Sequence, residues 1–207
     1  MATGNPGTST VNQAGMQPAG AATDCQELQQ ANNDRRQELA GKTKDKTLVG
    51  PNGTGNGTTI SSVKRTPIAG GSTKVRSAHN NIKAFEKCPQ TLAPGGSKAV
   101  RSGSPGPCGH VHGAPTMQKS GHAEARLLDE LLNAAPRRMT FSIDWRKGNG
   151  KRSKMPCKAC HRMMCTVKAC GHEITLCNKK GKPVPLSKEH CDGSDSARNK
   201  LLKAIDG

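Results

Sequence analysis

Residues 139–145, MTFSIDW, carry the clearest strand signal in the 207-residue sequence. Their side chains alternate between apolar and polar, which is the period of a strand that has one buried face. The apolar positions are Met139, Phe141, Ile143 and Trp145. Such a strand has to pair within a sheet, and its apolar face has to be covered by another layer of structure. The neighbouring segments indicate what that layer is.

The segments around this strand follow an alternating order of helix and strand. We expect helices over residues 122–133, 157–170 and 196–205, and a second strand over residues 173–177. Leucines at helical spacing mark the first helix, and Pro156 suits the opening turn of the second. This alternation predicts an α/β fold with a sheet between helices.

Residues 1–64 contain little that could build a core. Apart from one short helix expected at residues 24–40, which has a narrow apolar face, they consist largely of small and polar residues. Over the whole chain 32% of residues are hydrophobic and 1% aromatic, so part of it is expected to stay unfolded. We therefore expect a flexible tail and linker over residues 1–64 and a folded domain over residues 65–207. A chain that begins at Lys64 is expected to fold.

The positive charge is concentrated in the expected domain. The formal net charge is +17, and residues 65–207 carry 26 Lys or Arg against 10 Asp or Glu. A basic excess in one part of a chain predicts a polyanionic partner, and we expect nucleic acid. No apolar stretch approaches the roughly 18 residues of a membrane span. The N-terminus also lacks the features of a secretory signal peptide, so we expect no membrane association.

Five of the nine cysteines lie between residues 157 and 177. In a chain without a signal peptide, this density favours metal ligands over disulfides. Cys157 and Cys160 form a C-x-x-C pair at the start of an expected helix, where two thiolates can bind one metal ion and the helix N-terminus favours their ionised form.

Two ligand sets could complete this site. A local set would form a closed, structural zinc module, and its candidate residues are Cys165, Cys170, His172 and Cys177. The alternative takes His122 as the third ligand and leaves the fourth position to water, as a catalytic zinc ion requires. In that case we expect Cys165 to be a buried free thiol. Cys170, His172 and Cys177 then remain candidates for a second metal site.

The distant set explains more of the sequence, because it gives Glu124 a role. Glu124 is expected to be exposed at the start of the helix that follows His122, within reach of a zinc-bound water. Its carboxylate can then carry protons from the water to the substrate. We expect one Zn²⁺ per chain, with Glu124 as the catalytic residue and His122, Cys157 and Cys160 as ligands.

The order His122-x-Glu124, then Pro156-Cys157-x-x-Cys160, resembles the cytidine deaminase-like superfamily. The chain looks most like the deaminase domains at the C-termini of bacterial polymorphic toxins, over about residues 100–207. The resemblance implies a mixed sheet flanked by helices in an α/β/α sandwich, with the metal between two helix N-termini. It also implies two strands before the His122 helix, which are not readable in this sequence.

The function implied is hydrolytic deamination of a nucleobase, with cytosine in nucleic acid as the expected substrate. A toxin of this kind would be a monomer with a cognate immunity protein. It would be secreted by a specialised bacterial system and act in the cytoplasm of a target cell. Two alternatives stay open: a basic zinc-binding module that binds nucleic acid without catalysis, and a deaminase of free nucleosides.

Several further residues are candidates for substrate contacts. For Trp145, core packing is favoured over stacking on a base, because it continues the apolar face of its strand. Two of the others are loop histidines, which could contact the substrate or bind a metal, and three are basic residues near the C-x-x-C motif, which could bind phosphates. They are His110, His112, Lys151, Arg152 and Lys154.

Overall fold

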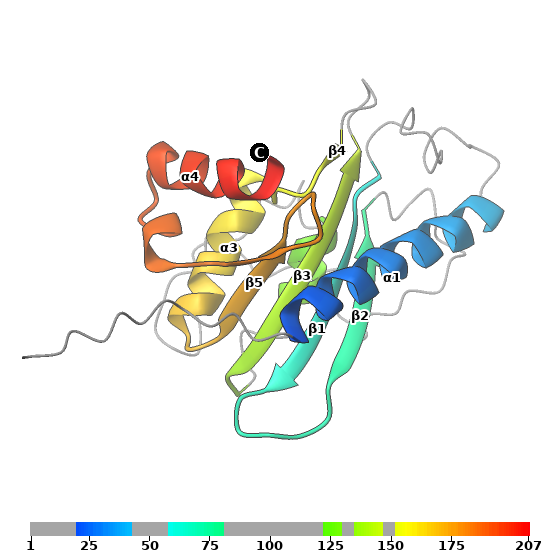
Figure 1. Cartoon of the computed structure of the whole chain (residues 1–207), viewed down its shortest axis with the longest axis horizontal. Helices are drawn as coiled ribbons and strands as arrows, with labels where there is room; N and C mark the ends of the chain where they lie inside the picture. Colours follow the sequence, from blue (N-terminus) through cyan, green and yellow to red (C-terminus); the bar gives the residue numbers. More distant parts are fainter. Residues whose placement is uncertain (1–19, 43–57, 81–121, 130–134, 147–151) are drawn as a thin grey trace, which may run out of the picture.

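The computed structural model describes residues 20–42, 58–80, 122–129, 135–146 and 152–207, which form a mixed sheet with helices on both faces (Figure 1). The helices of this part are α1 (Gly20–Lys42), α2 (Ala123–Asp129), α3 (Lys158–Ala169), α4 (Asp195–Asp206) and the short 3-10 helix η4 (Lys188–His190). The strands are β1 (Ile60–Pro67), β2 (Lys74–His79), β3 (Arg137–Arg146), β4 (Arg152–Ser153), β5 (Glu173–Cys177) and β6 (Pro183–Pro185). The predicted α/β class is confirmed.

Strand β3 is the centre of the sheet, whose order is β2-β1-β3-β5-β6. β1 pairs antiparallel with both β2 and β3, whereas β3 and β5 are parallel. The parallel step requires a crossover, and α3 provides it between β3 and β5. β4 extends the sheet locally by pairing with Trp145 and Arg146 at the end of β3. β1 and β2 supply the two strands that the resemblance implied and the sequence pattern did not reveal.

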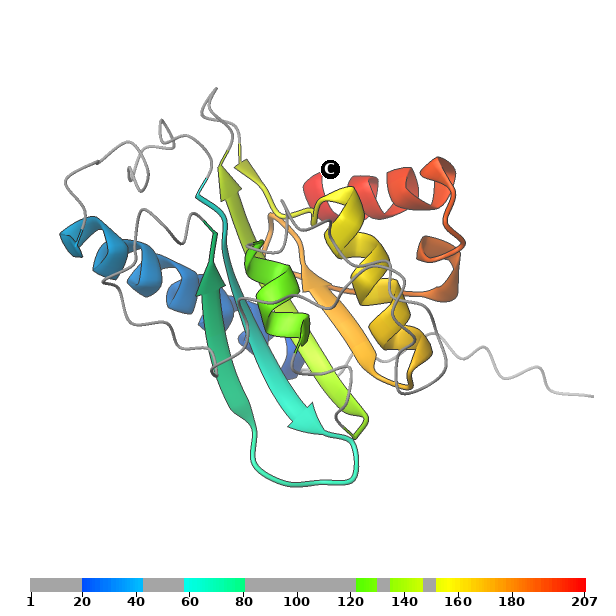
Figure 2. The ribbon, with the colours of Figure 1, turned by 180° about the vertical axis from the view of Figure 1, so that it is seen from behind.

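The apolar face of β3 packs against α2 and α3, which lie together on one side of the sheet (Figure 2). Met139, Phe141 and Ile143 are fully buried there, as their alternation predicted. The main core also contains side chains from the helices: Leu127, Leu128, Met163, Met164, Val167, Leu201 and Ile205. Trp145, half-buried at the end of the strand, packs against this core.

Helix α1 covers the opposite face of the sheet (Figures 1 and 2). Its buried residues recur every three or four positions, which places them in one stripe facing the strands. The members are Cys25, Leu28, Asn32, Arg35, Arg36 and Leu39. Half of this stripe is polar, so the helix is held by hydrogen bonds and ion pairs as well as by apolar contact.

The boundary expected between residues 64 and 65 does not hold, because it falls inside β1. β1 lies in the sheet interior between β2 and β3, and α1 packs on β1 and β3. Residues 20–42 and 58–64 are therefore part of the folded unit rather than a linker, and a chain that begins at Lys64 would lack half of an interior strand. The rest of the expected linker lies outside the described residues.

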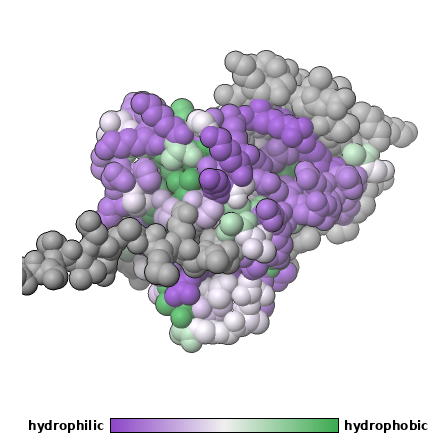
Figure 3. Space-filling model, viewed as in Figure 1, coloured by the Kyte–Doolittle hydropathy of each residue, from purple (hydrophilic) through white to green (hydrophobic). Residues whose placement is uncertain are grey.

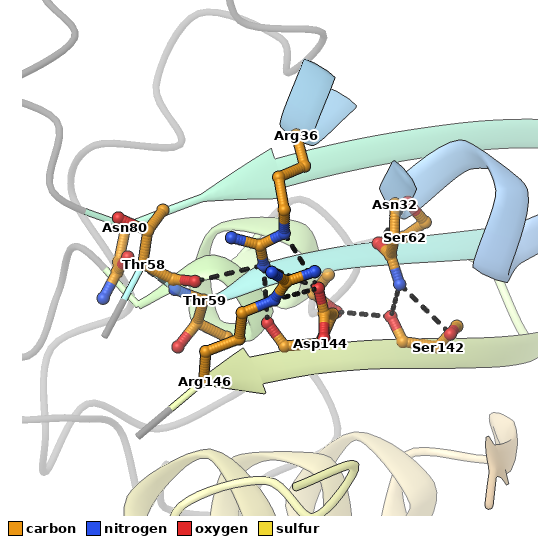
Figure 4. A network of polar contacts seen from close by, with 10 residues as sticks. Asn32, Arg36, Thr58, Thr59, Ser62, Asn80, Ser142, Asp144 and Arg146 are labelled. Carbon is orange, nitrogen blue, oxygen red and sulfur yellow. Dashed lines mark hydrogen bonds and ion pairs between the residues drawn. The ribbon is translucent and has the colours of Figure 1, made fainter. Parts of the chain in front are cut away.

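A buried ion pair joins α1 to the centre of the sheet (Figure 4). The Arg36 guanidinium donates from Nε and Nη2 to Asp144 Oδ2, at 3.0 and 2.6 Å, and from Nη2 to the Thr58 carbonyl at 3.3 Å. Arg146 donates to the same carboxylate oxygen at 3.3 Å. Burial by itself raises the pKa of Asp144, but Arg36 and Arg146 outweigh it and hold this pKa below its ordinary value.

A second group of polar contacts lies one turn along α1 (Figure 4). Asn32 donates through Nδ2 to the Ser142 carbonyl at 3.0 Å and accepts at Oδ1 from the Ser62 hydroxyl at 2.8 Å. The Asn32 amide thus has a partner for both its oxygen and its nitrogen, as an interior position favours. A disulfide between Cys25 and Cys177 fixes the same helix to β5.

The outer surface on the α1 side is largely hydrophilic, with scattered apolar residues (Figure 3). Among the described residues, the large hydrophobic side chains that are exposed are Ile68, Val75 and Leu202. None of the helices in this part of the chain has the length and apolar character that crossing a bilayer requires.

The shared carboxylate predicts unequal effects of truncating its partners. Asp144→Ala removes the acceptor of both Arg36 and Arg146, whereas Arg36→Ala leaves Arg146 beside Asp144. Breaking a buried pair costs about 3–5 kcal/mol, and we expect Asp144→Ala to reach the upper end and Arg36→Ala the lower. Urea unfolding measures both.

Arg138→Ala is the control, because Arg138 pairs with Glu173 on the surface, with side chains 64% and 60% exposed. Arg138→Ala should lower the free energy of unfolding by less than about 1 kcal/mol. Equal losses in all three variants would show that the buried pair does not secure α1.

His79 predicts a pH dependence of stability. It is buried on the α1 side, and burial, followed by Arg35 and Arg126, lowers its pKa to about 4, although Glu38 acts in the opposite direction. Between about pH 6.5 and pH 4 the unfolded chain binds a proton at His79 and the folded chain does not, so the free energy of unfolding falls as the pH falls.

The measurement compares urea unfolding of the wild type and His79→Gln at about pH 7, 5.5 and 4.5. The wild type should lose stability relative to the variant over this range, because contributions from other groups cancel in the comparison. A constant difference across the range would contradict a neutral His79.

Candidate metal centre

His122 and Glu124 lie at the start of α2. His122 directly precedes the helix, and its carbonyl accepts the first helical hydrogen bond, from Arg126 N at 3.1 Å. Glu124 is in the first turn, where a negative charge is favoured by the helix dipole. The helix packs against both the sheet and α3, so its first turn is enclosed.

The second half of the site comes from the start of α3. Cys157 is the N-cap residue, and its sulfur accepts a hydrogen bond from the backbone N–H of Cys160 at 3.4 Å. Cys160 is fully buried and Cys157 partly exposed. The C-x-x-C spacing therefore places both sulfurs at the N-terminal end of the helix, as the sequence predicted.

The structure brings the three predicted ligands together. His122 Nδ1 lies 3.3 Å from Cys157 Sγ and 3.5 Å from Cys160 Sγ, and the three atoms lie within 4.8 Å of one another. Zinc ligands bonded at 2.0–2.3 Å in a tetrahedron stand about 3.3–3.8 Å apart. His122, Cys157 and Cys160 can therefore hold a metal ion with little rearrangement.

The two sulfurs differ in their affinity for protons. A hydrogen bond from Cys160, together with one from His122, lowers the pKa of Cys157 to about 4. The same contact and burial raise the pKa of Cys160 well above its usual range. The pair thus shares one proton between a thiolate and a thiol, and a bound cation would take that proton's place.

Glu124 is buried, at 3% exposed, and not exposed at a helix end as the sequence suggested. The reason is that α2 packs against both the sheet and α3, which encloses its first turn. Burial raises the pKa of Glu124 to about 7, and the charge of Cys157 contributes to the increase. The carboxyl group is therefore held in the site, close to the ligands, in an environment that favours proton exchange near neutral pH.

A small pocket of about 120 Å³ opens onto this group. It is lined by Thr59, Asn80, His122, Glu124, Trp145 and Cys157. The volume is well below the roughly 300–1,000 Å³ of pockets for drug-sized ligands, so it suits one small ring.

Trp145 both packs against the core and lines this pocket. Thr59 and Asn80 were missed by the sequence analysis. They are joined by two hydrogen bonds, Thr59 N to Asn80 Oδ1 at 2.8 Å and Asn80 N to the Thr59 carbonyl at 3.1 Å. Thr59 directly precedes β1 and Asn80 directly follows β2. Neither strand had a clear sequence pattern, so there was no reason to select these two residues from the sequence.

The remaining residues predicted to contact substrate either line a different pocket or lie outside the residues that the structure describes. Arg152 and Lys154 line a different pocket, together with Asp144 and residues of α1. His110, His112 and Lys151 lie outside the described residues, and the proposed phosphate contacts stay predictions.

The other cysteines of the cluster form disulfides rather than metal ligands. Cys165 bonds to Cys191, Cys177 bonds to Cys25, and Cys170 is also disulfide-bonded. The expected free thiol at Cys165 is therefore wrong.

In the disulfide-bonded form, the same bonds exclude the local zinc module and the second site at Cys170, His172 and Cys177, because the required sulfurs are already bonded. His172 instead accepts a hydrogen bond at Nδ1 from the backbone of Arg137 at 3.2 Å. The sequence pattern did not indicate these disulfides, because the two cysteines of each described pair lie far apart in the sequence, by 152 and 26 positions.

A mixed sheet flanked by helices, with a His/Cys/Cys group between two helix starts, is compatible with a deaminase-like fold. Comparison with models of known families, with curated proteins and with solved structures finds no match. The assignment of a function therefore depends on the chemistry of the site.

The geometry predicts which residues bind metal. In its disulfide-bonded form, the chain is expected to bind one metal ion, and His122→Gln and Cys157→Ser should each lose it, because three ligands leave no redundancy. His172→Gln is the matched control, since His172 belongs to the excluded local set. Elemental analysis of purified protein measures the metal content. Loss of metal in His172→Gln, together with retention in His122→Gln, would overturn the assignment.

Proposed function

We propose that this chain is a zinc-dependent hydrolytic deaminase that acts on a nucleobase, with cytosine in nucleic acid as its substrate. The observation that carries the proposal is the buried Glu124 carboxyl group beside a His/Cys/Cys ligand set, in a pocket sized for one small ring. A closed structural metal site would need neither the carboxyl group nor the pocket.

When bound, zinc held by one imidazole and two thiolates would make water nucleophilic near neutral pH. Glu124 is placed to accept a proton there and to deliver protons to the ring nitrogen and to the leaving amine. One carboxyl group can serve all these transfers because it is enclosed in the pocket with the reacting base.

The pocket lining supports recognition of a nucleobase. Asn80 places a side-chain amide in the pocket lining, a group type that can recognise the edge of a base, and Trp145 presents an aromatic surface. The small volume favours a pyrimidine over a larger purine. For this reason we favour cytosine over adenine.

The charge supports nucleic acid over a free nucleoside. The chain carries a net charge of +17, which attracts a polyanion and contributes little to the binding of an uncharged nucleoside. The disulfides of Cys165 and Cys177 argue against the local zinc module that a binding protein without catalysis would use, and this alternative predicts no deamination in the test that follows. The free nucleoside remains an outcome of the test below.

We further propose that the deaminase acts as a bacterial toxin, with a cognate immunity protein as partner and another cell's cytoplasm as its place of action. The disulfides support exposure to an oxidising environment, such as the one a secreted protein meets. This part of the proposal depends on the resemblance stated for the motif.

The test is Glu124→Gln, which keeps the size of the side chain and removes its ability to exchange protons. The variant should fold and retain its metal, while deamination falls by at least about 10²-fold, the usual contribution of general acid–base catalysis. Single-stranded DNA, double-stranded DNA, RNA and free cytidine are each incubated with the protein, and conversion to uracil is measured.

Glu173→Gln is the control, because Glu173 is exposed on β5, pairs with Arg138 and is not among the residues that line the pocket. It should leave the rate unchanged. A Glu124→Gln protein that deaminates as fast as the wild type would remove Glu124 from the mechanism. A wild type that converts cytidine but no polynucleotide would favour the free-nucleoside alternative.

A further inference from the structure

A second His/Cys/Cys group lies outside the proposed catalytic site. His161 and Cys165 are one turn apart on α3, and Cys191 follows η4. One ligand atom from each lies within 4.8 Å of the others, and His161 Nε2 is 3.7 Å from Cys165 Sγ. Here Cys165 and Cys191 form a disulfide, and two bonded sulfurs cannot act as thiolate ligands.

We propose that reduction of the Cys165–Cys191 disulfide converts this group into a second metal site, suited to zinc or a chemically similar ion. The three donors are the same as those of the first site, namely one imidazole and two cysteine sulfurs. This donor set is typical of zinc. Because the disulfide already holds the two sulfurs together beside the imidazole, reduction frees ligands that are near one another.

The site is open to both a reductant and a metal ion. His161, Cys165 and Cys191 all line a pocket of about 370 Å³ between α3 and the start of α4. Cys165 and Cys191 are partly exposed, whereas Cys25 and Cys177 are 0% and 1% exposed. Accessible disulfides are the labile ones, so Cys165–Cys191 is expected to be reduced before Cys25–Cys177.

The reduction step needs a dithiol of the thioredoxin or glutaredoxin class. The S–S bond between Cys165 and Cys191 breaks, a new S–S bond forms in the dithiol, and its two hydrogens pass to Cys165 and Cys191. Metal binding then releases these two protons to solvent as the sulfurs become thiolate ligands. His161 would bind as a neutral imidazole, and solvent from the pocket would fill the fourth position.

The charged neighbours permit such a site. Arg162 and Arg198 line the same pocket and favour thiolates over thiols at the two cysteines. Two thiolates balance the charge of a divalent ion, so these cations do not repel the occupied site. The His190 carbonyl accepts a hydrogen bond from the His161 ring and lies 4.0 Å from Cys165 Sγ, so η4 also contributes to the surroundings of the group.

The experiment counts metal sites on the full chain in both redox states. Co²⁺ is titrated into the disulfide-bonded protein and into protein reduced by a phosphine, and the thiolate–cobalt absorption band is followed. We expect the number of bound ions to rise from one to two upon reduction. The second ion should be lost in His161→Gln, which keeps both cysteines, and in Cys191→Ser.

The double variant Cys25→Ser/Cys177→Ser is the control, because it removes the other described disulfide without touching this group. It should still gain the second ion on reduction. A reduced wild type that binds no additional ion would overturn the proposal, as would a second ion that persists in His161→Gln. A separate result would contradict the metal site at His122, Cys157 and Cys160, namely a disulfide-bonded protein that binds no ion.

Discussion

The candidate site depends on two helices that begin side by side. α2 and α3 pack against one another on the same face of the sheet, and their first residues supply one imidazole, two sulfurs and one carboxyl group. Positive potential at the N-terminus of α3 favours a thiolate at its N-cap residue Cys157, which prepares this sulfur to bind a cation. Apolar packing holds the helices in place, because Leu127 and Leu128 share the core with Met163 and Met164.

The two faces of the sheet are stabilised by different interactions. The face under α2 and α3 is apolar, as expected for a core formed by hydrophobic burial. The face under α1 contains a paired arginine and aspartate and a group of hydrogen-bonded serines and an asparagine. Apolar packing tolerates substitutions of similar volume, whereas a buried polar network requires each partner. The chain thus holds the α1 side through specific polar partners in addition to apolar contact.

Much of the C-terminal half could be predicted because its elements have clear periods. β3 alternates in steps of two, and α3, β5 and α4 follow in the expected order. α1 was expected only as a short helix with a narrow apolar face, and no clear pattern marked the first two strands. The physical reason is that the buried stripe of α1 includes Asn32 and Arg36 and the interior positions of β1 include Ser61 and Ser62, so hydrophobic periodicity underestimates the first element and does not reveal the second.

The group of three candidate ligands could be predicted from spacing, whereas its surroundings could not. The H-x-E and C-x-x-C motifs identified His122, Cys157 and Cys160, which the fold brings together. The burial of Glu124 and the presence of Asn80 in the pocket depend on tertiary packing. Disulfide pairing likewise depends on which cysteines the fold brings together.

The Cys25–Cys177 disulfide has a topological consequence, because it joins residues 152 positions apart. Nearly three-quarters of the chain therefore forms one covalently closed loop. Even when unfolded, such a loop cannot pass through a channel wide enough for a single extended strand, because at least two segments must enter side by side. Passage through a narrow channel thus requires the disulfide to be reduced beforehand or formed afterwards.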